Sequence, residues 1–550
     1  MRFNHTEVLS TDEVEAIHEA SLTILERIGM EFLDGESRSI MRAAGADVDE
    51  ATQRVRFPRE LVESSVAKAP HEFTLHSWNP AHDMRVGGRW LTFGTVASAP
   101  HYIDRHGVRR TGDRQGFQDL LKLAQMLNIV HYIAGYPVEP VDLHHSIRHL
   151  EATYDILTMT DKGLHCYSLG RQRNRDALEM VRIARGIDMA TLDREPSVIT
   201  VVNTNSPLRL DVPMAQGMME FAAHNQPIVV TPFTLAGAMA PITLAGAVAQ
   251  QNAEALGGIT FVQTVNPGAP VMYGGFTSNV DMQSGAPAFG TPEYVRTAMM
   301  GGQMARRYGF PYRSSNVCAA NALDMQAAYE SVFSLWGAIM GGVNFLMHGA
   351  GWMEGGLHAS LGKMVLDADL LAMVAAMLEP VPVNAETLAI DTFGQRDHSW
   401  GVRPSMGIPE PVTGASVPVS KVGSLFSFLF FSTDTLAGHL QIAERGADRT
   451  YLTGLVRDRR NLAAPDVHVV DATLRLEFHE GTRRFRDAVA DVDRVGQLRR
   501  ADRHVVLLVF LDLREAADRL FEDVVGDVVV DRRHLADQHV LADHRAVADG

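Results

Sequence analysis

Three segments of the chain combine aromatic rings with Asn, Ser or His side chains, and two of them also contain glycines. The candidate site residues that they contain are Tyr273, Phe276, Tyr312, Arg313, Ser315, Asn316, His348, Trp352 and Glu354. Aromatic rings can hold a quaternary ammonium group by cation–π contact, and an arginine can pair with a carboxylate. Taken singly, each Asn or Ser also fits a helix cap and each ring fits a protein core. What distinguishes the set is that its residues cluster at the last three predicted strands.

Other residue combinations indicate less. His145 and His149 have the i, i+4 spacing of a zinc pair on a helix, but an exposed polar helix start is the favoured interpretation. His165 and Cys166 end a predicted strand, where they offer a soft metal ligand or a nucleophile. The sequence contains no Walker A loop, GxSxG elbow or HExxH motif.

Eight short apolar runs, each followed by a helical pattern, are the elements that must position these residues. The expected strands are residues 91–96, 131–137, 164–169, 198–203, 228–231, 271–276, 312–317 and 344–348. This count over about 290 residues predicts an α/β fold, a (β/α)8 TIM barrel, whose chemistry lies at the carboxyl ends of its strands. The alternative is an open doubly wound sheet, although no GxGxxG turn follows a strand.

Both ends of the chain differ from this pattern. Residues 1–70 predict an N-terminal helical cap, residues 71–390 the barrel, and residues 391–550 an anomalous, poorly folded segment. Residues 451–550 contain 16 Arg but no Lys, Ser, Ile or Met. Such a bias fits a charged helical tail, but we favour translation of a GC-rich gene in a shifted frame.

Composition excludes several classes of protein. The chain of 550 residues is 46% hydrophobic and 21% charged, as in globular proteins, and its net charge of −16 argues against nucleic-acid binding. Two cysteines suit a reducing compartment, and we expect neither a signal peptide nor a membrane span. The predicted location is the cytoplasm.

Five distinctive motifs occur from residue 273 onward. They are YGGF at 273–276, SGAPAFGTPE at 284–293, YRSSN at 312–316, AAYES at 327–331 and GAGWMEGG at 349–356. Together these motifs resemble the trimethylamine methyltransferase (MttB) superfamily. The resemblance runs from the N-terminal helices to about residue 390 and belongs to the branch without pyrrolysine. It fails after about residue 395, where a Gly-Gly-His-Phe-like motif is expected.

The resemblance implies a corrinoid-dependent methyltransferase. Such an enzyme moves a methyl group from a quaternary or tertiary amine, such as glycine betaine, to the Co(I) of a corrinoid carried by a separate protein. The implied partners are this corrinoid protein and a small methylated amine, with a homo-oligomer possible, and no tightly bound metal. The alternatives are an inactive or truncated barrel homologue with a binding role only and, more weakly, an unrelated barrel lyase or aldolase.

Strand position, rather than the family, suggests the roles. We expect His348, Asn316 and Glu354 to be catalytic, and Tyr273, Phe276, Tyr312, Arg313, Ser315 and Trp352 to bind substrate in an open cavity. Arg313 is a candidate partner for a substrate carboxylate, although a structural salt bridge is an equal alternative. Glu354 is placed to neutralise a cation.

Overall fold

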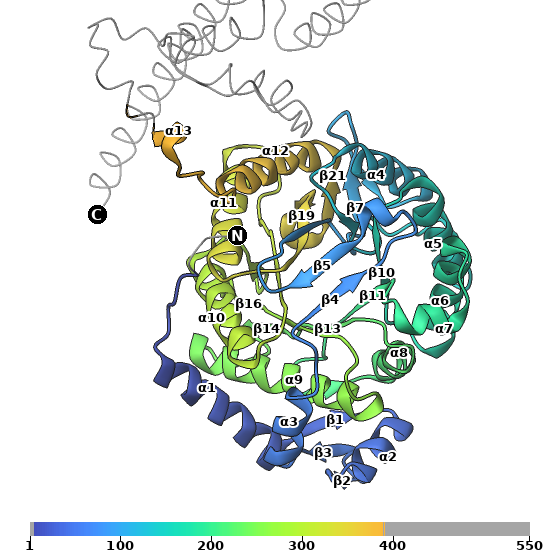
Figure 1. Ribbon diagram of the computed structural model, residues 1–550, viewed down its shortest axis with the longest axis vertical. Coiled ribbons are helices and arrows are strands. Elements are labelled where there is room, and N and C mark those ends of the chain that lie inside the picture. The colour runs from blue at the N-terminus through green and yellow to red at the C-terminus, as the bar shows by residue number, and fades with distance from the viewer. Residues whose placement is uncertain (1–4, 389, 391–550) are drawn as a thin grey trace, which may run out of the picture. The chain divides into compact units, whose positions relative to one another are not determined.

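The computed structural model describes residues 5–388 and 390 of the chain (Figure 1). The last described helix is α13 (Ala385–Leu388), and the predictions made for residues 391–550 lie outside the described residues.

Eight parallel strands form a closed barrel, which confirms the predicted fold. In chain order they are β6 (Thr92–Thr95), β9 (Tyr132–Ile133), β10 (Gly163–Tyr167), β11 (Ile199–Val202), β13 (Ile228–Val230), β15 (Val271–Gly274), β18 (Tyr312–Ser315) and β19 (Phe345–Ala350). Each strand pairs with the next one along the chain, and β19 closes the circle by pairing with β6. The open-sheet alternative is therefore excluded.

A helix follows each barrel strand and covers it from outside (Figure 1). These helices are α4 (Arg114–Met126), α5 (Arg148–Met159), α6 (Arg171–Arg185), α8 (Val212–Ala223), α9 (Leu244–Val265), α10 (Pro292–Tyr308), α11 (Met325–Met340) and α12 (Leu361–Met377), and a short helix, α7 (Met189–Arg194), follows α6. Side-chain caps explain several of the starts: Asp113, Asp211, Asp324 and Ser360 each accept a hydrogen bond from a backbone N–H of the first turn.

The apolar side chains form two layers, one inside the barrel and one between the barrel and its helices. Successive residues of a strand point to opposite faces, so Met272 belongs to the inner cluster and Tyr273 to the outer one. The inner layer also holds Tyr132 and Phe345, whose rings stack with their centroids 3.9 Å apart. The lower part of the barrel is therefore filled by side chains rather than open.

A hairpin that the sequence did not reveal closes the amino-terminal end of the barrel. It consists of β4 (Glu72–Leu75) and β5 (Met84–Gly87), which cross the barrel opening in Figure 1. Leu75, Met84 and Val86 join the inner apolar cluster. Access to the interior is therefore left to the opposite, carboxyl end.

The first 70 residues contain strands as well as the expected helices. The helices are α1 (Thr11–Thr23), α2 (Gly35–Ala43) and α3 (Arg59–Val66), and the strands are β1 (Met30–Phe32), β2 (Asp47–Asp49) and β3 (Arg54–Arg56). α1 and α3 pack along α9 on the outside of the barrel. β1 also pairs with β12 (Arg209–Leu210), a short strand after β11.

Two small sheets extend from the carboxyl ends of the barrel strands. One contains β14 (Phe233–Ala236), β16 (Phe276–Val280) and β17 (Pro287–Ala288), and the other β7 (His101–Ile103), β8 (Arg109–Thr111), β20 (Trp352–Met353) and β21 (His358–Ser360). Phe276 and Trp352 thus stand on these extensions, above the barrel strands. Within the described part of the chain, no helix has the length and apolar character needed to cross a membrane.

Candidate active site at the carboxyl end of the barrel

Strand β18 sorts its predicted site residues onto two faces. The Tyr312 hydroxyl donates a hydrogen bond to the Ala298 carbonyl of α10 at 2.7 Å, so this ring faces the helices. Tyr273 likewise faces outward, and its hydroxyl accepts a hydrogen bond from Gln251 of α9 at 3.3 Å. Neither ring lines the barrel interior. Arg313, the alternate residue on β18, extends instead toward Phe276.

A bulge in β19 brings His348 into the region where Arg313 and Phe276 meet. The register between β19 and β6 shifts between Leu346 and Ala350, and His348 has a left-handed φ of 55°. A bulge re-aims a side chain, and a left-handed conformation is costly for a residue other than glycine. The His348 ring lies 4.1 Å from the Trp352 ring, and its Nδ1 is 3.0 Å from the Ser315 hydroxyl. The structure thus unites His348, Ser315 and Trp352.

Aromatic rings from three segments meet around Phe276. The Trp352 ring stands at 89° to the Phe276 ring and at 87° to the Phe289 ring, and the Phe276 and Phe289 rings are stacked 5.6 Å apart. All three side chains are buried, so the rings pack on one another instead of bordering the open cavity that we expected. Phe289 belongs to a family-like motif, but strand position alone gave no reason to place it here.

Arg313 brings a positive charge into this cluster. Its side chain is 2% exposed, and its guanidinium carbon lies 4.9 Å from the centre of the Phe276 ring. Among the residues that the structure describes, neither its Nε nor its Nη1 has a hydrogen-bond partner, and no carboxylate forms an ion pair with it. The salt-bridge alternative for Arg313 is therefore not realised within the described residues. Burial lowers the pKa of this guanidinium from its ordinary value, yet it stays charged near neutral pH.

The histidines of the interior are held neutral. Burial, and after it the charge of Arg313, lowers the pKa of His348 well below 6.5. Burial is also the main reason that the pKa of His165 falls to about 4, and the backbone N–H of Val201 donates to its Nε2. A neutral His348, whose Nδ1 pairs with the Ser315 hydroxyl, presents Nε2 to a ligand and adds no positive charge.

We expect the chain to lose stability as the pH falls from 7 to 5. The pKa of His131 and that of His165 are each lowered to about 4 in the folded chain, against 6.5 for an ordinary histidine. Between those values the unfolded chain binds protons that the folded chain does not, so folding is favoured above about pH 6.5 and weakened below it. Each of the two histidines should lower the free energy of unfolding by about 1–2 kcal/mol between pH 7 and pH 5. Urea unfolding at both pH values checks this. A His165→Asn variant should show a shallower dependence, and equal slopes would contradict the assignment to His165.

Two other predicted site residues brace the loops. Glu354 forms an ion pair with Arg109, and its other oxygen lies 2.5 Å from His358 Nδ1, so its charge is already neutralised at the rim. Asn316 donates from Nδ2 to the Gly349 carbonyl at 2.9 Å and thereby supports the bulged end of β19. The structure gives both residues positioning contacts and does not bring Glu354 to the aromatic cluster.

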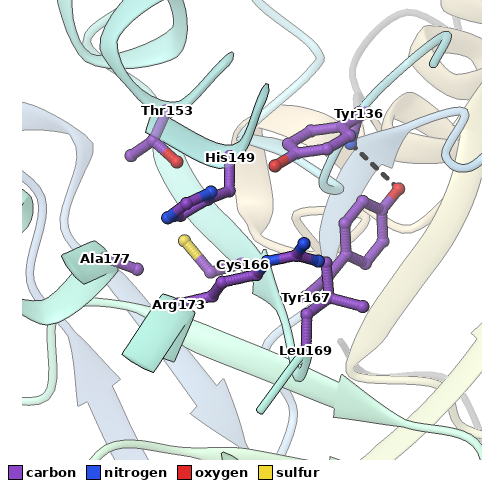
Figure 2. Close-up of a pocket in the computed structure, with 8 residues that line it drawn as sticks. All are labelled: Tyr136, His149, Thr153, Cys166, Tyr167, Leu169, Arg173 and Ala177. Atoms are coloured by element: carbon purple, nitrogen blue, oxygen red, sulfur yellow. Dashed lines mark hydrogen bonds between the residues drawn. The ribbon is translucent and has the colours of Figure 1, made fainter. Parts of the chain in front are cut away.

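The competing candidates of the sequence do not form sites. His149 Nε2 lies 2.8 Å from Asp176, while His145 is exposed. Cys166 points away from the interior, toward α5 and α6, where burial raises the pKa of its thiol to about 12. Figure 2 shows the narrow cavity that His149 and Cys166 line, with a free volume of about 10 Å³, enough for one water molecule. In the described part of the chain, no group of three or more His, Cys, Asp or Glu side chains is placed to hold a metal ion.

A parallel eight-stranded barrel with a buried aromatic and cationic cluster at the carboxyl ends of its strands is the architecture of a barrel enzyme. The chain belongs to the trimethylamine methyltransferase (MTTB) family, whose model matches residues 1–401. It is 33% identical over 387 residues to a glycine betaine methyltransferase of Desulfitobacterium hafniense, a match covering 70% of this chain and 80% of the relative. A trimethylamine methyltransferase, MttB1, of Methanosarcina mazei is 30% identical over 392 residues, covering 70% and 79%. The predicted family, and with it the predicted methyltransferase class, is confirmed.

Among solved structures, the chain is similar to the monomethylamine methyltransferase MtmB of Methanosarcina barkeri. The TM-score is 0.46 and the identity 12%, over 67% of this chain and 79% of the other.

Proposed function

We propose that this chain transfers a methyl group from a quaternary or tertiary amine, such as glycine betaine, to the Co(I) of a corrinoid held by a separate protein. The observation that carries the proposal is the aromatic cluster of Phe276, Phe289 and Trp352 beside His348, in a chain of this methyltransferase family. Aromatic faces attract a trimethylammonium group by about 0.5–2 kcal/mol for each good contact. Opening the packed rings to admit the ligand is part of the binding step.

The chemistry asks little of the protein beyond placement. The bond between carbon and nitrogen breaks with its electron pair left on nitrogen, so a quaternary ammonium leaves as a neutral tertiary amine and needs no proton. Neutral His348, held by Ser315, can therefore orient the ligand without serving as an acid. The corrinoid, when bound, supplies the nucleophile that takes the methyl group.

The rim of the barrel suits a partner that delivers such a group. Large apolar side chains stand exposed on the loops that follow the carboxyl ends of the strands, namely Ile242, Met282, Leu323 and Leu357. Exposed apolar groups on a rim are typical of a surface that another protein or a flat apolar ring covers. The methyl acceptor would reach the aromatic cluster from this side, because the hairpin of β4 and β5 occupies the other end.

An assay with a reduced corrinoid protein tests the proposal. Glycine betaine, trimethylamine and choline are each incubated with the chain and the Co(I) form of the protein, and demethylated product is followed by NMR. We expect product from at least one of them, and none when the chain is omitted. The assay is run on the chain as it stands and on one whose reading frame near codon 395 has been checked and, if needed, corrected. Absence of product with both chains would favour the inactive-homologue alternative.

A further inference from the structure

We infer that Arg313 selects zwitterionic methylated amines, because its guanidinium binds their carboxylate while its charge opposes methylated amines that carry only a positive charge. This inference rests on the proposed function and names the substrate class of the same site. It goes beyond methyl transfer as such, because it assigns recognition of the substrate's carboxylate to one residue.

The first support is a set of unused hydrogen-bond donors. Arg313 Nε and Nη1 and the Tyr132 hydroxyl are all buried, and none of them has a partner among the described residues. The guanidinium can only donate, and its planar fork matches the two oxygens of a carboxylate. A buried charge left unpaired is costly, so a ligand that brings an anionic group relieves the cost. The missing partner of Arg313 is thus best supplied by the substrate.

The second support is the field of the same charge. Arg313 helps to lower the pKa of both His348 and His165, which shows that its charge opposes further positive charge across the interior. A tetraalkylammonium ion entering the cluster meets the same opposition. A zwitterion does not, because its carboxylate pairs with Arg313 while its ammonium group turns to the rings.

The third support is the short span between the two subsites. The guanidinium carbon lies 4.9 Å from the centre of the Phe276 ring. Because the guanidinium itself lies over the Phe276 ring, the ammonium group of a ligand must use the neighbouring Trp352 ring, whose centre lies 6.3 Å from that of Phe276. A ligand that reaches both Arg313 and Trp352 must carry its carboxylate close to its ammonium. A single methylene between them, as in glycine betaine, meets this requirement, whereas a long spacer carries the carboxylate past Arg313.

Calorimetric titration of the full chain, without any corrinoid protein, provides the test. The ligands are glycine betaine, its methyl ester, which keeps the shape but carries a net positive charge, and tetramethylammonium. We expect the wild-type chain to bind glycine betaine about 10- to 100-fold more tightly than the ester, the range set by hydrogen bonds to charged groups. Arg313→Met should lose that preference, and Arg313→Lys should keep part of it. Arg296→Met, the same change at an exposed position of α10, should bind like the wild type.

Equal binding of glycine betaine and its ester by the wild-type chain would overturn the inference without any need for a variant. So would an Arg313→Met variant that melts cooperatively and keeps the preference. The outcome is separable from that of the proposed function. A chain that binds glycine betaine through Arg313 but demethylates nothing contradicts the function alone, and a chain that demethylates the ester and glycine betaine equally well contradicts the inference alone.

Discussion

Replacing Asp367 with alanine is expected to lower the free energy of unfolding by about 3–5 kcal/mol. Asp367 and Lys363 form an ion pair on α12, and the side chains of both are fully buried. Among the described residues, removal of the carboxylate leaves the Lys363 ammonium with only the Ser331 hydroxyl, at 2.7 Å, for a partner. Burial raises the pKa of Asp367 despite the opposing effect of the Lys363 charge, because desolvation disfavours the carboxylate. Urea unfolding measures the change.

Two further variants decide whether the buried charge is the cause. The double variant Lys363→Met with Asp367→Leu removes both charges, and it should recover most of the lost stability. Glu15→Ala breaks the surface pair with Arg307 and should cost less than about 1 kcal/mol. Asp367 also accepts a hydrogen bond from the Gly351 N–H at 2.8 Å, and both variants lose it. If the double variant were as unstable as Asp367→Ala, this lost hydrogen bond or packing, rather than charge, would explain the loss.

Replacing Trp352 with alanine is expected to reduce kcat/KM for a zwitterionic methylated amine by about 30- to 100-fold. The indole ring lies against His348 and stands across Phe276 and Phe289, so its removal opens the aromatic cluster to water. Positive charge on the substrate diminishes as the methyl group leaves. A lost cation–π contact should therefore weaken substrate binding more than the chemical step, and KM should change more than kcat.

Trp352→Phe retains a ring face and should keep a substantial part of the activity. Trp90→Ala removes an exposed tryptophan next to the hairpin end of the barrel and should leave the kinetics unchanged. Steady-state assays with saturating corrinoid protein compare the three variants. A Trp352→Ala enzyme with wild-type KM and kcat would mean that the substrate binds elsewhere.

The barrel was predictable because its signal repeats eight times. Parallel strands covered on both faces form short continuous apolar runs, and residues 228–231 and 271–276 are such runs. Because both faces of such a strand are apolar, the sequence does not distinguish residues that point into the barrel from residues that point toward the helices. Met272 and Tyr273 are both buried, and nothing in their apolar character tells which points inward. The predicted substrate contacts of Tyr273 and Tyr312 fell on the wrong face for this reason.

Parts of the site depended on features that sequence patterns do not report. Phe289 lies in a connection where no strand position could be counted, and only its place in a family-like motif indicated a role. The bulge at His348 lets it follow the inward-facing Met347 toward the interior, which strict alternation forbids. The strands of the hairpin at residues 72–87 are four residues each and carry charged residues, so they gave no apolar run to notice.

The sealed end of the barrel has a consequence for the order of events. Because β4 and β5 fill the amino-terminal opening of the barrel, the amine and the methyl acceptor would both approach from the carboxyl end. An acceptor protein bound at the carboxyl end of the barrel would block entry and exit of the amine. Under the proposed function, the amine must therefore arrive before the acceptor protein docks, and the demethylated product must wait until the acceptor departs. The hairpin, although far from the reacting atoms, would thus impose an ordered sequence of substrate binding and product release on the turnover cycle.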